Sequence, residues 1–178
     1  MNFVQVKDKR FKLYLSEKEI QSRIDLLAEE INAAYFGKKP LLLPILNGAF
    51  LFAADLIRRL TVEPELQFLA ISSYEGGMES SGKVRSLIGL DRNIQDRHIL
   101  FIEDIVDTGH TCDYLHESFA KKGAASIKMA SLLYKPESFV GTHKPDFVGF
   151  EIPADFVIGY GLDYDQAGRE LPAIYTLA

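Results

Sequence analysis

The sequence predicts an α/β protein in which a parallel β-sheet is flanked by helices on both faces. Apolar runs typical of buried strands alternate with segments of helical periodicity through residues 16–135. Polar or glycine-containing segments follow several strands, and right-handed crossovers would bring these segments to one edge of the sheet. Open α/β sheets bind ligands at that edge, so the sequence predicts a binding crevice there.

Length, charge and cysteine content narrow the class of protein. The chain has 178 residues, enough for a single domain over residues 1–178 with its own core. A net charge of −5 argues against a nucleic-acid-binding surface, and a single cysteine, Cys112, excludes an internal disulfide. No apolar run is long enough to span a membrane, and residues 1–10 are too polar for a secretory signal. We therefore expect a cytoplasmic protein with no nucleic-acid or membrane partner.

The first elements follow from apolar spacing and capping residues. After a short strand over residues 11–15, Ser16 and Glu19 form the pattern of a capping box. Apolar residues then recur at helical spacing, which indicates core packing. A buried strand is predicted over residues 40–46 and a helix over residues 50–60.

Two segments that follow strands are candidates for ligand binding. Asn47-Gly48 joins the strand at 40–46 to the next helix, and Gly48 either lets a ligand approach the backbone or only makes a tight turn. A third strand, Leu66 to Ser73, leads into a Gly- and Ser-rich segment that ends before a strand at 86–90. Loops of this length are usually functional, so we expect residues 74–85 to form a mobile lid; a plain hairpin tip is the alternative.

Residues 98–111 carry most of the chemistry. An apolar strand, His98 to Ile102, ends at two carboxylates, Glu103 and Asp104. Residues 107–111, Asp-Thr-Gly-His-Thr, follow and lead into a helix, whose N-terminus offers unpaired N–H groups to a phosphate. The two carboxylates would repel a phosphate, but they suit ribose hydroxyls or a cation that bridges to phosphates.

The last part of the chain differs from the first. A strand over residues 127–134 ends at Lys135, which is placed either to bind a ligand or only to be solvated. Short apolar pieces broken by proline and glycine follow. We predict a core of about residues 16–140 and a small β-rich hood, built from residues 1–15 and 141–178, over the ligand-binding edge.

The apolar strand followed by Glu-Asp-x-x-Asp-Thr-Gly-x-Thr, at Ile99 to Thr111, resembles the phosphoribosyl-pyrophosphate (PRPP) loop of type I phosphoribosyltransferases. Further motifs resemble the branch that uses 6-oxopurines: Leu46-Asn47-Gly48, Ser73-Tyr74, Lys135, and residues 144–150 and 156–164. The resemblance covers nearly the whole chain. It implies a purine-salvage enzyme that transfers the phosphoribosyl group of PRPP to N9 of hypoxanthine, and of guanine, giving IMP or GMP and pyrophosphate with Mg²⁺ as cofactor.

The resemblance also implies a role for each motif residue. Five residues would bind the 5′-phosphate: Asp107, Thr108, Gly109, His110 and Thr111. The ribose would lie on Glu103 and Asp104, and these two with Asp163 would serve the metal. Pyrophosphate would lie against Leu46, Asn47, Gly48 and Arg169. The purine pocket would comprise Lys135, Phe156, Val157, Leu162 and Asp163, and the lid would begin at Ser73 and Tyr74.

Several of these roles have a physical rationale. Lys135 would donate to the 6-oxo group, which disfavours adenine because adenine carries an amine there. Phe156 would stack on the base. Asp107 is the candidate general base for the purine ring proton, with pure positioning or charge stabilisation as the alternative. Asn47 and His110 stand where relatives often carry lysine, and the resemblance implies a cis peptide between Leu46 and Asn47.

Other chemistries fit less well. Walker, Gly-x-Gly-x-x-Gly and Gly-x-Ser-x-Gly motifs are absent, and a second Asp-Thr-Gly for an aspartic-protease dyad does not occur. A nucleotide-sensing regulator that binds RNA or DNA conflicts with the net charge, and a pyrimidine or adenine enzyme conflicts with Lys135 and Phe156. Because relatives form dimers and tetramers, the resemblance implies a homodimer or homotetramer.

Overall fold

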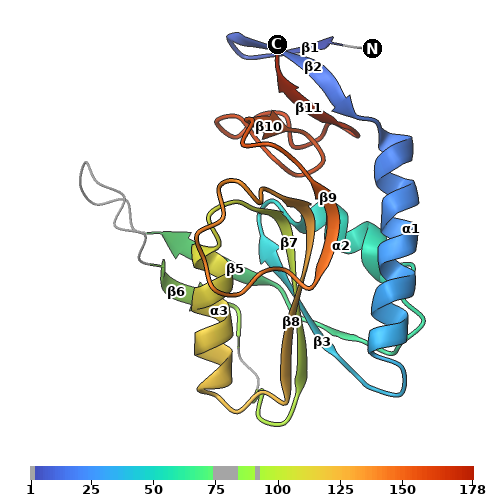
Figure 1. The fold of residues 1–178 in the computed structure, drawn as a ribbon, viewed down its shortest axis with the longest axis vertical. Coiled ribbons are helices and arrows are strands. Elements are labelled where there is room, and N and C mark those ends of the chain that lie inside the picture. Colours follow the sequence, from blue (N-terminus) through green and yellow to red (C-terminus); the bar gives the residue numbers. More distant parts are fainter. Residues whose placement is uncertain (1–2, 74–83, 91–92) are drawn as a thin grey trace.

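A mostly parallel sheet forms the centre of the molecule in a computed structural model that describes residues 3–73, 84–90 and 93–178 (Figure 1). Its strand order is β6-β5-β3-β7-β8-β9, with β4 paired to β3. The strands are β3 (Leu41–Leu46), β4 (Glu65–Leu66), β5 (Leu69–Ser73), β6 (Val84–Ile88), β7 (His98–Val106), β8 (Ser126–Tyr134) and β9 (Phe147–Glu151). Among the described residues every pairing in this sheet is parallel except β5 with β6.

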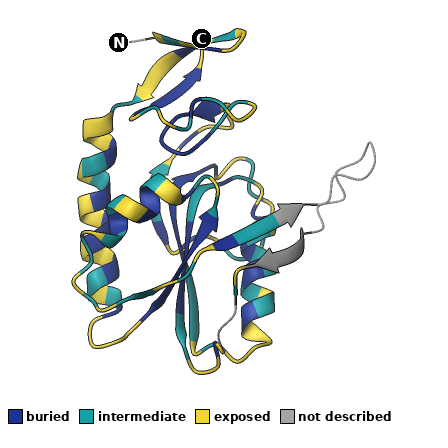
Figure 2. Cartoon of the chain, turned by 180° about the vertical axis from the view of Figure 1, so that it is seen from behind, coloured by how far each residue is buried: buried dark blue, intermediate teal, exposed yellow. Residues whose placement is uncertain are grey.

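Helices cover both faces of this sheet, as predicted. The helices are α1 (Glu17–Ala34), α2 (Phe50–Ile57) and α3 (His110–Ala120). The predicted capping box is present, because Ser16 accepts from the Glu19 N–H and Glu19 accepts from the Ser16 N–H. Leu100 and Ile102 of β7 pack toward α1 and α2, whereas Ile99 and Phe101 pack toward α3. The central strands are therefore buried on both faces (Figure 2). Among the described residues, none of the helices has the length and apolar character that crossing a bilayer requires.

A second, antiparallel sheet lies over the carboxyl ends of the large sheet's strands (Figure 1). Its order is β1-β2-β11-β10, from β1 (Phe3–Val6), β2 (Lys9–Leu15), β10 (Val157–Ile158) and β11 (Ile174–Leu177). We call this sheet and the loops between β10 and β11 the hood. It combines both ends of the described chain, as predicted, and has a small core of its own around Phe11 and Ile158.

The predicted border of the hood is wrong for residues 147–151. They form β9, which pairs parallel with β8 in the large sheet, with Phe147 opposite Ala130. The short apolar run suggested a hood strand, but Phe147 is buried in the core cluster beneath α1 and α2. An apolar strand that follows a proline can join either sheet, and this packing decides between them.

Strand β7 is also longer than predicted. The sequence placed its end at Ile102, yet β7 pairs with β8 as far as Val106 opposite Tyr134. Glu103 and Asp104 therefore lie within the strand and not after it. Backbone pairing continues past them because the ladder with β8 satisfies the backbone polar groups whichever side chains the residues carry.

Candidate active site

The two carboxylates of β7 lie in different surroundings. Glu103 is half-buried as a residue, but its Oε2 atom is buried and makes no hydrogen bond to any described residue. Burial, followed by the neighbouring charge of Asp104, raises the pKa of Glu103 well above its ordinary value. A buried carboxylate oxygen without a partner is costly in a folded protein, so it is a candidate for contact with a ligand.

Asp104 faces the other segments of the site. Its Oδ1 accepts a hydrogen bond from the Ile105 N–H at 2.9 Å. Burial raises the pKa of Asp104 to about 6, although the Ile105 N–H and the Arg169 guanidinium act to lower it and Asp163 to raise it. The charges of two hood residues, Arg169 and Asp163, thus act on the Asp104 carboxylate and couple β7 electrostatically to the hood.

The Leu46-Asn47-Gly48 segment lies against the side chain of Asp104. The peptide bond between Leu46 and Asn47 is cis, as the resemblance implied. A Cβ atom on Gly48 would stand only 1.6 Å from Asp104 Oδ2. The Gly48 carbonyl in turn lies 2.0 Å from where a Cβ atom of Gly161 would be. Both glycines are therefore required for close packing, and Gly48 does more than make a tight turn, because its backbone packs directly on the Asp104 side chain.

The residues of the predicted phosphate loop surround the first turn of α3. Gly109 is the N-terminal cap residue of α3, with φ at +88°. A cavity of about 120 Å³ is lined by Glu103, Asp107, Thr108, Gly109, Thr111 and neighbouring residues. His110 and Thr108 are exposed. A helix N-terminus beside a cavity that holds two threonines supplies N–H and hydroxyl donors of the kind that bind phosphate.

Asp107 and Lys135 meet at this edge of the sheet. Lys135 Nζ donates to Asp107 Oδ2 at 2.9 Å. Lys135 is buried with a side-chain exposure of 9%, whereas the side chain of Asp107 is 47% exposed. The backbone N–H of Lys135 donates to the carbonyl of Val106, the residue before Asp107. This bond keeps Lys135 next to Asp107. The Asp107 carboxylate, which can accept a proton, is thus held beside the Lys135 ammonium, a buried cationic donor.

A second ion pair lies in the hood. Arg169 forms an ion pair with Asp163 Oδ1 at 2.7 Å and donates a hydrogen bond to the Gly161 carbonyl at 2.8 Å. Gly161 N–H donates back to the Arg169 carbonyl at 3.0 Å, so backbone and side chain fix this arginine together. Gly161 packs on Gly48 and is hydrogen-bonded to Arg169. Gly161 therefore holds Arg169 close to the Leu46-Asn47-Gly48 segment. The predicted pyrophosphate residues thus form a connected group.

The predicted purine residues of the hood are divided by burial. Val157 and Leu162 are buried, whereas Phe156 is 47% exposed. The Phe156 ring lies edge-on to Tyr164 at a centroid distance of 6.0 Å and tilted to Phe11 at 6.3 Å. An exposed aromatic ring supported on one side by two others can offer its free face to a planar ligand.

Sequence reasoning missed two residues that make close contacts in this site. Gly161 and Phe139 make close contacts with Gly48 and Gly109, and only the fold reveals them because each partner is distant in the sequence. Of the predicted lid, Ser73 ends β5, whereas Tyr74 and the other residues up to 83 of the predicted range 74–85 lie outside the described residues.

This fold and this edge define a class of protein. The family model for the phosphoribosyl transferase domain matches residues 13–165. The chain therefore belongs to the phosphoribosyltransferase family.

Individual relatives narrow the comparison. Hypoxanthine-guanine phosphoribosyltransferase of Bacillus subtilis (strain 168) is 44% identical over 166 residues, which cover 93% of this chain and 92% of the relative. The enzyme of the same name from Lactococcus lactis is 43% identical, covering 93% and 90%. A solved structure of hypoxanthine phosphoribosyl transferase from Trypanosoma cruzi has a TM-score of 0.89 at 38% identity, covering 98% and 95%. A Bacillus anthracis hypoxanthine-guanine phosphoribosyltransferase structure, with HEPES in its active site, has a TM-score of 0.84 at 32% identity, covering 94% and 96%.

Proposed function

We propose that this chain transfers the 5-phosphoribosyl group of PRPP to N9 of hypoxanthine or guanine, releasing pyrophosphate and giving IMP or GMP. The bond from C1′ to pyrophosphate oxygen breaks, the bond from C1′ to N9 forms, and the purine loses a ring proton. One observation carries this function: the Asp107–Lys135 pair stands directly beside the cavity at the N-terminus of α3. A phosphate site and a purine-reading pair then share one edge of the sheet. The similarity to enzymes of this name over 93% of the chain supports the same activity.

The phosphate end of PRPP would lie at the first turn of α3. The backbone N–H groups of the turn and the hydroxyls of Thr108 and Thr111 would donate to the 5′-phosphate. The positive end of the helix dipole favours an anion there. His110 would contribute its backbone N–H, because it is the first residue of α3.

The ribose would lie on the carboxylates of β7. Ribose hydroxyls donate hydrogen bonds, and Glu103 Oε2 is an acceptor without a partner among the described residues. The transition state carries positive charge on the ribose ring, so ionised carboxylates beside it would stabilise that state more than the ground state. Asp104 is in place to supply such a charge above pH 6.

The purine would be read by Lys135 and Asp107. The Lys135 ammonium would donate to the 6-oxo group, and Asp107 would accept the ring proton as the bond to C1′ forms. Their mutual hydrogen bond supports this role because it holds both groups before the base arrives. Phe156 would stack on the purine, with the Val157 backbone at the edge of the base.

The donor set of the site fits a magnesium ion. Described residues contain no ready-made cluster of three or more ligating side chains. Mg²⁺ rarely needs one, since it usually binds through one or two carboxylates together with substrate phosphates. Glu103 and Asp104 would hold it on the ribose side, and Asp163 would hold a second ion through water. When bound, the metal neutralises pyrophosphate as a leaving group. Arg169 and the Leu46-Asn47-Gly48 backbone would bind the same pyrophosphate with a guanidinium fork and N–H donors.

The activity is tested by pyrophosphate release. Purified protein is mixed with PRPP and Mg²⁺ and with hypoxanthine, guanine, xanthine or adenine in turn, and pyrophosphate is measured. The proposal expects release with hypoxanthine and guanine, and almost none with adenine, because Lys135 would face the adenine amine. Absence of release with all three oxopurines, or release with adenine alone, would reject the proposed function.

We also propose that the protein is cytoplasmic and forms a homodimer or homotetramer. A buried free thiol at Cys112 suits the reducing cytoplasm. Leu26 on α1 and Phe36 just after it expose large apolar side chains, which supports assembly into a homodimer or homotetramer. Light scattering across a concentration series measures the mass directly, and a monomer at every concentration would refute the assembly.

A further inference from the structure

A segment outside the predicted site lies directly on the phosphate loop. Residues 139–143, between β8 and β9, form what we call the clasp. The N–H groups of Val140 and Gly141 both donate to the Thr108 carbonyl, at 3.0 and 3.1 Å. Two donors on one carbonyl fix the plane of the Thr108–Gly109 peptide. Because the C=O and N–H of a trans peptide point in opposite directions, the Gly109 N–H points away from the clasp.

One carboxylate on α3 holds the clasp in place. Asp113 accepts hydrogen bonds from the Thr142 N–H at 2.9 Å and from the His143 N–H at 2.8 Å. The His143 ring, stacked on His116 at 3.7 Å, also contacts Asp113 through Nδ1 at 3.0 Å. Partial burial opposes ionisation of Asp113, but these donors lower its pKa below the ordinary value. Asp113 is thus a charged acceptor with several converging donors.

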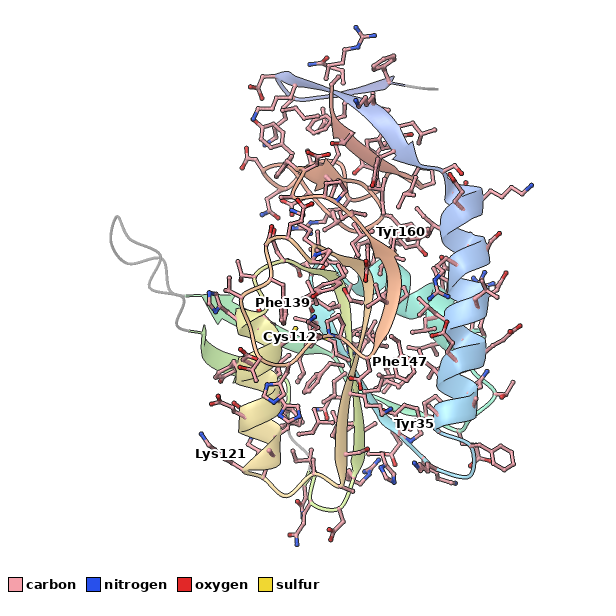
Figure 3. All side chains as sticks on the ribbon, in the orientation of Figure 1. Tyr35, Cys112, Lys121, Phe139, Phe147 and Tyr160 are labelled. Atoms are coloured by element: carbon pink, nitrogen blue, oxygen red, sulfur yellow. The ribbon has the colours of Figure 1, made fainter. Side chains whose placement is uncertain are left out.

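The packing between the clasp and the phosphate loop leaves no spare room. A Cβ atom on Gly109 would lie 2.3 Å from the Phe139 ring, which itself stands edge-on to Tyr134 at 5.5 Å. A Cβ atom on Gly141 would lie 3.1 Å from both Asp113 Oδ2 and Phe139 Cζ. Figure 3 shows Phe139 close to Cys112, beside the upper end of α3. A shift of the clasp would therefore be transmitted to Gly109.

We propose that Asp113 is a positioning residue for the 5′-phosphate, acting through the clasp on the Thr108–Gly109 peptide. Asp113 anchors residues 142 and 143, residues 140 and 141 orient the Thr108 carbonyl, and the Gly109 N–H is thereby aimed outward as a phosphate donor. This role rests on the proposed function, since it requires a phosphorylated ribose at the first turn of α3. It predicts that loss of Asp113 weakens phosphate binding although it removes a negative charge from that turn.

The sign of this effect separates positioning from electrostatics. A carboxylate in the first turn of α3 repels a phosphate bound there, so simple removal of charge should tighten binding. Loss of the clasp should weaken it, because the donors would no longer be held toward the ligand. The test is the dissociation constant of ribose 5-phosphate, measured by calorimetry for the wild type, Asp113→Ala and Asp113→Asn. Ribose 5-phosphate needs neither catalysis nor pyrophosphate or purine binding, so it reports on the phosphate turn and the ribose carboxylates only, and among the described residues no hydrogen bond joins Asp113 to either carboxylate.

We expect Asp113→Ala to weaken ribose 5-phosphate binding about ten-fold, the loss that follows when a charged acceptor of backbone donors is removed. Asp113→Asn should fall between it and the wild type, because an amide oxygen can still accept from Thr142 and His143. The KM for PRPP should rise in parallel while the KM for hypoxanthine stays within about two-fold. Glu117→Gln, which neutralises an exposed carboxylate on the same helix, should change neither constant.

A merely structural role is separated by a stability-matched variant. Phe119→Leu removes core packing beneath α3 without touching the clasp, so it should lower Tm and leave ribose 5-phosphate binding unchanged. Gly141→Ala should disturb the clasp while keeping every donor, and should weaken binding in the same direction as Asp113→Ala. Unchanged or tighter binding in Asp113→Ala would overturn the proposal. Wild-type protein that binds ribose 5-phosphate but forms no IMP would instead reject the proposed function and leave the positioning role standing.

Discussion

The phosphate side and the hood side of the candidate site are built in different ways. On the phosphate side, Glu103 to Thr111 are consecutive in the chain and lie at the junction of β7 and α3. Their shape is set by the β7–β8 ladder and by the two large core clusters. On the hood side, Phe156 and Arg169 come from separated loops around a small core of their own.

The two ways of building the site imply that phosphate and ribose on one hand, and the purine on the other, bind to different parts of the molecule. A phosphate or ribose would meet groups fixed by the central sheet, which is the most buried part of the molecule (Figure 2). A purine would meet Lys135 from the core on one side and hood residues on the other. The hood joins the core through buried residues that belong to the same cluster as α1 and α2, namely Val157, Tyr160, Leu162 and Ile174. It also meets the core through Gly161 on Gly48 and through the Tyr160 hydroxyl on Asp55 Oδ2. Substitutions on the two sides should therefore change different kinetic constants.

The largest expected effect is that of Asp107→Asn, which removes the candidate base where the two sides meet. Loss of a general base typically lowers turnover by roughly 10²–10⁴-fold, whereas the amide keeps the shape of the loop. We expect kcat to fall in that range and the KM for PRPP to change little. Steady-state kinetics measure both constants. Glu137→Gln, at an exposed carboxylate nearby, is the matched control. Equal losses in kcat and PRPP affinity would assign Asp107 to binding instead.

Gly48→Ala should have the next largest effect, because it forces apart the contact that joins the two sides. The new Cβ atom would collide with Asp104 Oδ2, so the carboxylate must move, and this disturbs the hydrogen bond that Asp104 Oδ1 accepts from the Ile105 N–H. Misplacement of a binding group by about 1 Å can lower activity by about 100-fold, and overpacking costs about 1–3 kcal/mol of stability. Activity assays and thermal unfolding test this together. Gly37→Ala, at an open position of positive φ, should lose stability but keep full activity.

Asp104→Asn separates stability from function on the phosphate side. The folded protein holds the Asp104 proton more tightly than the unfolded chain does, with a pKa raised from 3.8 to about 6. The stabilisation by this proton is fully present below pH 3.8 and is lost as pH rises through about 6. Since one pKa unit corresponds to ~1.36 kcal/mol, ionised Asp104 costs the ligand-free fold about 3 kcal/mol at neutral pH.

Asparagine does not titrate, so Asp104→Asn should be more stable than the wild type at pH 8 and should lose that advantage toward pH 4. It should also bind PRPP poorly, because an amide offers weaker acceptance to ribose hydroxyls and no charge to a metal. Denaturant unfolding at several pH values measures the first effect, and the KM for PRPP measures the second. A variant less stable than the wild type at pH 8 would contradict the view that Asp104 is held ionised for a ligand.

The phosphate side and the hood side also differ in how well the sequence predicts them. The phosphate side was readable because strand, carboxylates and loop are consecutive, so their spacing alone placed them together. The end of β7 was predicted too early because acidic residues look like a boundary, whereas the ladder with β8 continues beneath them. The convergence of Gly48, Asp104 and Lys135 at one edge followed from topology rules.

The hood was readable only in outline. Its strands are short, and residues 147–151 joined the large sheet instead, because the burial of Phe147 beneath α1 is a long-range contact that local pattern does not contain. The contact of Gly161 with Gly48 and the clasp on Thr108 connect residues far apart in the chain. No local signal marks such pairs, although glycine at both close contacts is consistent with them.

The most direct test of this division is the pair of KM values for Lys135→Met, an apolar side chain of similar length. Lys135 would bind the purine and not PRPP, and a hydrogen bond from a charged donor is worth about 1.5–3 kcal/mol. We therefore predict a rise of about ten-fold or more in the KM for hypoxanthine and an unchanged KM for PRPP. Lys144→Met, at an exposed lysine, should change neither value. An unchanged KM for hypoxanthine, or an equal rise in both values, would contradict the account.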